Sequence, residues 1–133
     1  MFPGQGSQIV GMGKAVADEV KEAEAVFTKA DEKLQFPLSK LIFEGPQDQL
    51  TLTMNAQPAL LTASFAIMQL FKREGISPDY VAGHSLGEYT ALVAAEAISF
   101  EDGVLAVRKR GEYMEEAVPN GEGTMAAVLG LER

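Results

Sequence analysis

One serine of this sequence lies in a pattern typical of a nucleophile. Residues 83–87 read Gly-His-Ser-Leu-Gly, which fits G-x-S-x-G, a serine on a sharp turn between a strand and a helix. The short apolar run 80–83 predicts a buried strand, and a helix is predicted from Leu86 to about residue 97. Free N–H groups at the start of that helix would stabilise an oxyanion beside Ser85. The pattern alone leaves a second interpretation open, in which Ser85 only caps the helix.

A cation is predicted on or beside the buried face of a later helix. The spacing of apolar residues predicts a helix over 100–118, and Arg110 lies three residues after Val107 and four before Met114 on its apolar stripe. A buried charge is costly unless it is paired, and a planar guanidinium suits a carboxylate, which it binds through two hydrogen bonds. Arg110 could therefore hold an anionic ligand. Pairing with an internal carboxylate, or an exit of the side chain to solvent, remains an alternative.

The single histidine, His84, is not expected to act as the base for Ser85. It precedes Ser85 at the end of the predicted strand, where successive side chains point to opposite faces. One histidine and no cysteine also exclude a histidine-rich or thiolate metal site, a disulfide and a cysteine nucleophile. No metal site is predicted.

Four further segments must position these residues. Residues 1–13 contain four of the thirteen glycines, which predicts a loop whose backbone approaches something closely. Helices are predicted over 15–34 and from Pro58, as a first-turn residue, to Gly75, the latter apolar nearly all round. The pair Gly45-Pro46 predicts a break between them, and a strand is predicted over 124–131.

Length and composition limit the class of protein. The 133 residues allow one compact domain, and 47% hydrophobic with 23% charged residues is typical of a globular protein. A net charge of −8 argues against nucleic acid as a partner. We expect neither a signal peptide nor a membrane span, because the longest apolar segment, 59–71, is interrupted and falls short of roughly 20 residues. The lack of cysteine is compatible with a cytoplasmic location, which we expect.

Taken together, four motifs resemble the malonyl-CoA:acyl carrier protein transacylase family in order and spacing. They are Phe-Pro-Gly-Gln-Gly-Ser-Gln at 2–8, Gln-Pro-Ala-Leu at 57–60, Gly-His-Ser-Leu-Gly-Glu-Tyr at 83–89, and Arg110-Gly111 with Met114. The resemblance covers essentially the whole chain. It implies an α/β fold, with an incomplete α/β-hydrolase-like large subdomain carrying the nucleophile elbow over 1–120. Residues 121–133 would begin a ferredoxin-like small subdomain with its first strand.

The resemblance also implies a reaction and its partners. Ser85 would take malonyl from malonyl-CoA as a seryl ester and pass it to the phosphopantetheine thiol of acyl carrier protein, in fatty acid biosynthesis. The backbone N–H groups of Gln5 and Leu86 would form the oxyanion hole, which explains the glycines at positions 4 and 6. No cofactor is implied besides these two substrates, and neither nucleic acid nor a membrane is expected as a partner.

The substrate pocket is likewise implied by the resemblance. Arg110 would hold the malonyl carboxylate, and Met114, Gln57 and His84 would line the pocket. A methionine on an apolar stripe is more often part of the core, and a glutamine before a helical proline can simply cap the helix. Those simpler interpretations of Met114 and Gln57 stay open.

The family's base is a second histidine far downstream, and this chain does not contain it. We therefore expect the chain to be an excerpt of a longer protein and to be nearly inactive alone. One alternative is an acyltransferase domain excised from a polyketide or fatty acid synthase, and another is a catalytically incomplete fragment. A serine esterase is less favoured, because neutral esters give Arg110 nothing to hold.

Overall fold

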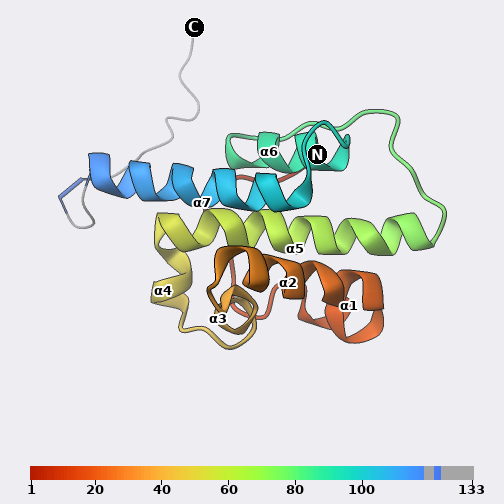
Figure 1. The fold of residues 1–133 in the computed structure, drawn as a ribbon, viewed down its shortest axis with the longest axis horizontal. Coiled ribbons are helices and arrows are strands. Elements are labelled where there is room, and N and C mark those ends of the chain that lie inside the picture. The colour runs from red at the N-terminus through yellow and green to blue at the C-terminus, as the bar shows by residue number, and fades with distance from the viewer. Residues whose placement is uncertain (119–121, 124–133) are drawn as a thin grey trace, which may run out of the picture.

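The computed structural model describes residues 1–118, 122 and 123. In this part the chain forms seven α-helices joined by loops (Figure 1). In chain order they are α1 (Lys14–Glu19), α2 (Lys21–Leu34), α3 (Leu38–Glu44), α4 (Gln47–Thr51), α5 (Thr53–Arg73), α6 (Leu86–Ala94) and α7 (Phe100–Ala117). None of the helices in these residues is long and apolar enough to cross a membrane.

The long helix α5 lies at the centre of the molecule. Figure 1 shows α7 along one side of α5 and the helices α1, α2 and α3 on the other, and α6 packs against both α5 and α7. Because neighbours cover both sides, α5 buries residues around most of its circumference, among them Ala56, Ala59, Leu61 and Ala66. The prediction of a helix that is apolar nearly all round is confirmed.

The helix predicted over 15–34 is interrupted at Val20. This residue has an extended backbone (φ −125°, ψ 107°), so α1 ends before it and α2 begins after it. The Val20 N–H still donates to Val16, and its carbonyl accepts from Ala23 and Glu24. The bend lets Val20, which is 1% exposed, pack into the core. No glycine or proline marks the position, so the sequence offers no sign of the break.

Pro58 is not the first-turn residue that the sequence predicts. Helix α5 begins at Thr53, and Pro58 lies inside it, fully buried. A proline has no N–H, so the carbonyl of Met54, four residues earlier, loses its helical partner. Arg108 of α7 supplies a donor instead, with Nη1 at 3.2 Å from the Met54 oxygen. The tertiary contact makes an interior proline tolerable here.

The buried strand predicted over 80–83 is wrong. Residues 1–118, 122 and 123 contain no strand, and 80–83 make only an isolated parallel bridge in which Gly83 pairs with Phe2. The Phe2 N–H donates to the Ala82 oxygen (2.8 Å), and the Phe2 oxygen accepts from the N–H of His84 (3.2 Å). Tyr80 is 94% exposed. A strand needs partners along its length, and Phe2 provides one residue of pairing.

The remaining predicted elements agree closely with the structure where it describes them. Helix α7 matches the prediction to within one residue, with Ser99 as its N-cap accepting from the Asp102 N–H (3.0 Å). Helix α6 begins at Leu86 as predicted but ends at Ala94, and the Gly45-Pro46 break separates α3 from α4. The predicted strand at 124–131, and with it most of the small subdomain, lies outside the described residues.

Candidate functional site

Ser85 lies on a strained turn immediately before α6. Its backbone has φ 53° and ψ −108°, a conformation that a residue with a side chain rarely adopts. Ser85 occupies the N-cap position of α6, yet its side chain makes no capping hydrogen bond. The interpretation of Ser85 as a simple cap is therefore not supported. The exposed hydroxyl is directed to another helix instead.

Two glycines permit this turn because backbone segments approach each other there without room for a side chain. A Cβ atom on Gly83 would lie 1.9 Å from the Gly87 backbone. A Cβ atom on Gly87 would lie 2.4 Å from the carbonyl oxygen of Phe2. Both distances are far below van der Waals contact. The elbow is thus packed directly on the N-terminal loop, where a Cβ atom on Gly4 would lie 2.7 Å from His84 Nδ1.

Arg110 of α7 reaches the Ser85 hydroxyl. Its Nη2 donates to Ser85 Oγ at 3.1 Å, its Nη1 donates to Gln57 Oε1 at 2.8 Å, and its guanidinium carbon lies 5.9 Å from the centre of the Tyr89 ring. Arginine can only donate, so the Ser85 oxygen accepts this bond. The proton of the Ser85 hydroxyl remains available to a base.

The charge of Arg110 is not balanced by a carboxylate within the described residues. The ion pairs found between residues 1 and 118 do not include it. The alternative of an internal carboxylate is therefore not observed in this part of the chain. A half-buried guanidinium whose contacts are an amide, a hydroxyl and a ring can take an anionic group beside Ser85.

Gln57 and Met114 join Arg110 in one network. Gln57 is fully buried inside α5, so it does not cap the helix. Its Oε1 accepts from Arg110, and its Nε2 donates to Met114 Sδ at 3.1 Å. The amide is used at both ends, which fixes its orientation and orients one edge of the guanidinium. Four of the predicted site residues are thus brought together from α5, α7 and the elbow.

The His84 ring contacts the N-terminal loop. Its ring lies beside Gly4 of the N-terminal loop, where an added Cβ atom would lie 2.7 Å from His84 Nδ1. No hydrogen bond joins His84 to Ser85 in the described part of the chain. This geometry agrees with the expectation that His84 does not take the serine proton. Its role in lining the pocket stays a prediction.

The two backbone groups predicted for an oxyanion hole belong to the elbow and to the loop packed against it. Leu86 is the first residue of α6, and Gln5 belongs to the loop whose residues Phe2 and Gly4 touch the elbow. Within residues 1–118, neither N–H donates to a protein acceptor. The side chain of Gln5 donates to Thr53 Oγ1 at 3.1 Å, which ties the loop to the start of α5.

The sequence family described as "Acyl transferase domain" matches residues 1–132. This chain belongs to that family. Its acyl transferase domain is 62% identical over 132 residues to "Malonyl CoA-acyl carrier protein transacylase" of Bacillus subtilis (strain 168), covering 99% of this chain and 42% of that protein.

Solved structures of relatives share the fold of this acyl transferase domain. The crystal structure of the acyl-carrier-protein S-malonyltransferase from Bartonella henselae is 48% identical and matches with a TM-score of 0.90, over 98% of this chain and 43% of that one. A type II PKS acyl-carrier protein in complex with its malonyl-transacylase gives 45% identity and a TM-score of 0.85, over 90% of this chain and 39% of that one. The chain therefore spans well under half the length of these relatives.

Several residues around the site of this acyl transferase domain were not predicted from the sequence. Tyr89 faces Arg110, and Thr53 binds Gln5. Tyr89 ends the elbow motif, which could have drawn attention to it, whereas nothing in the local sequence marks Thr53. Gly111 was noted only as a neighbour of Arg110, yet a Cβ atom there would lie 2.6 Å from the Cα of Met54. It lets α7 approach α5 closely at the site.

Proposed function

We propose that this chain carries the nucleophile half of a malonyl-CoA:acyl carrier protein transacylase of fatty acid biosynthesis. The observation that carries the proposal is the contact of Arg110 with the hydroxyl of Ser85, because it puts a cation beside a serine on a nucleophile elbow. A malonyl group differs from a neutral acyl group by its free carboxylate, which is what a guanidinium binds. The names of the relatives from Bacillus subtilis and Bartonella henselae support the same reaction.

The first half-reaction loads the serine. Ser85 Oγ attacks the thioester carbonyl carbon of malonyl-CoA while its proton passes to a base. The carbonyl oxygen becomes an oxyanion, which the N–H groups of Gln5 and Leu86 stabilise. The intermediate then collapses, the carbon–sulfur bond breaks, and coenzyme A leaves as a thiol after taking up the proton. The product is a malonyl ester of Ser85.

The second half-reaction reverses these steps with another thiol. The phosphopantetheine thiol of acyl carrier protein attacks the ester, and Ser85 recovers its proton. A thioester is exchanged for a thioester, so no redox cofactor is required. That a relative is described as bound to an acyl-carrier protein supports this partner.

We propose that residues 1–120 belong to the large α/β-hydrolase-like subdomain and that residues 121–133 begin the small subdomain.

We propose that the base is a histidine that lies outside these 133 residues, as the resemblance implies. His84 is the single histidine of the sequence, and its ring lies on Gly4. Positioned general-base catalysis contributes roughly 10²- to 10⁴-fold. We therefore expect the 133-residue chain alone to turn over at least about two orders of magnitude more slowly than the full-length protein.

A serine esterase is the competing function. It is disfavoured because a neutral ester leaves the Arg110 charge without a ligand group. An acyltransferase domain of a polyketide or fatty acid synthase would run the same chemistry on the same residues.

Intact mass spectrometry of the full-length protein tests the proposal. Incubation with malonyl-CoA should add one malonyl group, and peptide mapping should place it on Ser85. The Ser85→Ala variant should take up none. Uptake by Ser85→Ala at wild-type stoichiometry would contradict the assignment.

A further inference from the structure

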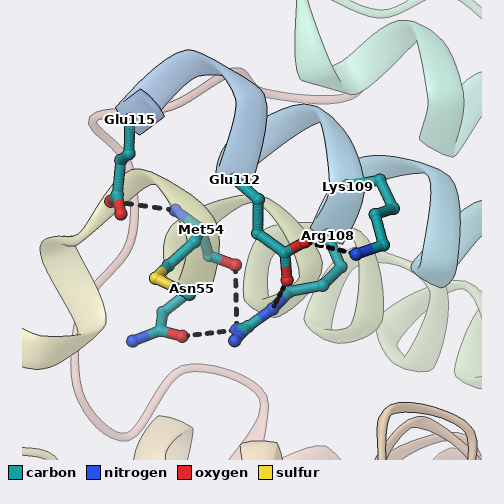
Figure 2. A network of polar contacts seen from close by, with 6 residues as sticks. All are labelled: Met54, Asn55, Arg108, Lys109, Glu112 and Glu115. Atoms are coloured by element: carbon teal, nitrogen blue, oxygen red, sulfur yellow. Dashed lines mark hydrogen bonds and ion pairs between the residues drawn. The ribbon is translucent and has the colours of Figure 1, made fainter. Parts of the chain in front are cut away.

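Helix α7 holds both backbone groups of a single residue near the start of α5. Glu115 Oε1 accepts from the Met54 N–H at 3.2 Å, and Arg108 Nη1 donates to the Met54 carbonyl oxygen at 3.2 Å. Figure 2 shows the two side chains reaching Met54 from α7. They are seven residues apart, so they project from the same face of the helix. We call Arg108 and Glu115 the Met54 clamp.

Both backbone groups of Met54 need partners from outside α5. Met54 lies in the first turn of the helix, where an N–H has no acceptor within the helix. Its carbonyl would normally accept from residue 58, which is a proline and has no N–H. The Met54 clamp therefore serves two groups that the helix itself leaves without partners. Such groups are costly when they are removed from water.

The clamp is itself fixed in position. Arg108 is 17% exposed and also bonds Asn55 Oδ1 (2.6 Å) and Glu112 Oε1 (3.0 Å), as Figure 2 shows. Gly111 lies between Arg108 and Glu115 along α7, and a Cβ atom there would be 2.6 Å from the Met54 Cα. The two helices therefore touch backbone to backbone at Met54. Neither sliding nor separation is possible here without breaking these contacts.

This contact lies one helical turn from the candidate site. Gln57 follows Met54 by three residues on α5, and it bonds Arg110 and Met114 of α7 at 2.8 and 3.1 Å. The register of α5 against α7 thus decides whether the Gln57 amide meets the guanidinium of Arg110. A shift of about 1 Å in such a contact can cost a reaction on the order of 10²-fold.

We propose that Arg108 and Glu115 are positioning residues for acyl-group selection. By holding Met54 they set the register of α5 on α7, which places Gln57 against Arg110 and so orients the guanidinium toward Ser85. They act through Gln57 and Arg110 and touch no substrate. The proposal rests on the proposed function, since its readout is the preference for malonyl over acetyl.

The first test measures the effect of Arg108→Met on acyl-group preference in the full-length protein, once in the wild-type background and once in the Pro58→Ala background. Arg108→Met should lower the ratio of kcat/KM for malonyl-CoA to that for acetyl-CoA by about tenfold. Pro58→Ala restores an N–H that can bond the Met54 carbonyl within α5. In the Pro58→Ala background the loss caused by Arg108→Met should shrink to about threefold or less. An equal loss in both backgrounds would overturn the role assigned to the Met54 carbonyl contact.

The second test uses Glu115. Glu115→Gln keeps an oxygen that can accept from Met54 and should retain the wild-type ratio within about twofold. Glu115→Leu removes the acceptor and should lower the ratio, as Arg108→Met does. If Glu115→Gln lowers the ratio as much as Glu115→Leu does, the charge of Glu115 matters and its bond to Met54 does not. If neither variant lowers the ratio, Glu115 has no positioning role. Hydrogen exchange at the Met54 amide should quicken in Glu115→Leu alone.

A control variant and the malonylation of the wild type distinguish failure of the positioning role from failure of the proposed function. Lys29→Met removes a surface cation that pairs with Glu101 of α7 at 3.6 Å, and it should leave the ratio unchanged. The ratio itself cancels any loss of folded protein. If the wild type is not malonylated on Ser85, the proposed function fails. If the wild type is malonylated and the clamp variants keep its ratio, the positioning role fails while the function stands.

Discussion

Arg110 Nη2 donates to Ser85 Oγ across 3.1 Å, although the two residues come from α7 and from the turn before α6. An acyl group attached to the Ser85 oxygen would extend beside the guanidinium. A free carboxylate on that group gains a charge-assisted bond, and a methyl group gains nothing. Under the proposed function, this contact would make the loading of Ser85 depend on whether the acyl group carries a free carboxylate.

Replacing Arg110 should change selectivity more than general activity. In the full-length protein, Arg110→Ala would remove the bidentate contact that we propose with the malonyl carboxylate, which is worth roughly 2 to 4 kcal/mol. Malonyl transfer should therefore fall on the order of 30- to 1000-fold, while acetyl transfer should not suffer equally. Arg110→Lys should retain part of the preference, because an ammonium lacks the planar fork. The ratio of the two kcat/KM values measures this, and equal losses for both acyl groups would make Arg110 structural.

Gln57 offers a way to change the charge of the site at nearly constant shape. Gln57→Glu places a carboxylate where Oε1 now accepts from Arg110 at 2.8 Å. The new carboxylate would pair with the guanidinium and compete with the malonyl carboxylate for it. Malonyl loading of Ser85 should fall about tenfold or more, since a hydrogen bond to a charged group contributes roughly 1.5 to 3 kcal/mol. Stopped-flow or quench measurements of ester formation with malonyl-CoA and acetyl-CoA would show it, and an unchanged malonyl rate would contradict the competition.

The elbow glycines should tolerate no side chain. Gly83→Ala places a Cβ atom 1.9 Å from the Gly87 backbone, so the turn or the start of α6 must move. We expect a loss of about 3 kcal/mol or more in the free energy of unfolding, the upper range for overpacking. Gly75→Ala is the matched control, because its surroundings are open and only its φ of +73° opposes the change. It should cost about 1 to 2 kcal/mol. Urea unfolding of both variants measures the two losses in free energy of unfolding, and similar losses would argue against the steric explanation.

Glu112 should make the free energy of unfolding depend on pH in the acidic range. The Lys109 ammonium hydrogen-bonds the Glu112 carboxylate and holds its pKa below the ordinary value near 4.5; loss of solvent opposes the shift, and Arg108 adds to it. Because the folded-state pKa is lowered, the stabilisation is complete above that ordinary value and is lost as the pH falls through the folded-state pKa.

Glu112→Gln should therefore lower the free energy of unfolding at pH 7 by roughly 0.3 to 1 kcal/mol. The difference from the wild type should disappear in acid. Lys109→Met should not add its full effect to that of Glu112→Gln, because both remove the same ion pair (2.7 Å). Urea titrations between neutral and acidic pH measure both, and a difference that persists below the folded-state pKa would refute this account.

Local chemistry made part of this protein predictable from its sequence. The elbow could be identified because Gly83 and Gly87 are the residues that a close backbone approach demands, and such a demand is visible in the residue types themselves. Helix α7 was predictable because its apolar stripe keeps one period throughout. The placement of Arg110 at the edge of that stripe followed from the same periodicity.

Contacts between distant segments decided the rest. Val20 interrupts the first long helix because its side chain packs into the core, and Pro58 sits inside α5 because Arg108 supplies the donor that the proline lacks. The run 80–83 is no strand here, because Phe2 alone pairs with it. Whether Arg110 would meet a carboxylate, solvent or Gln57 also depended on the register of α5 and α7. Residue types show which groups need partners, and only the packing of the helices determines which partners they find.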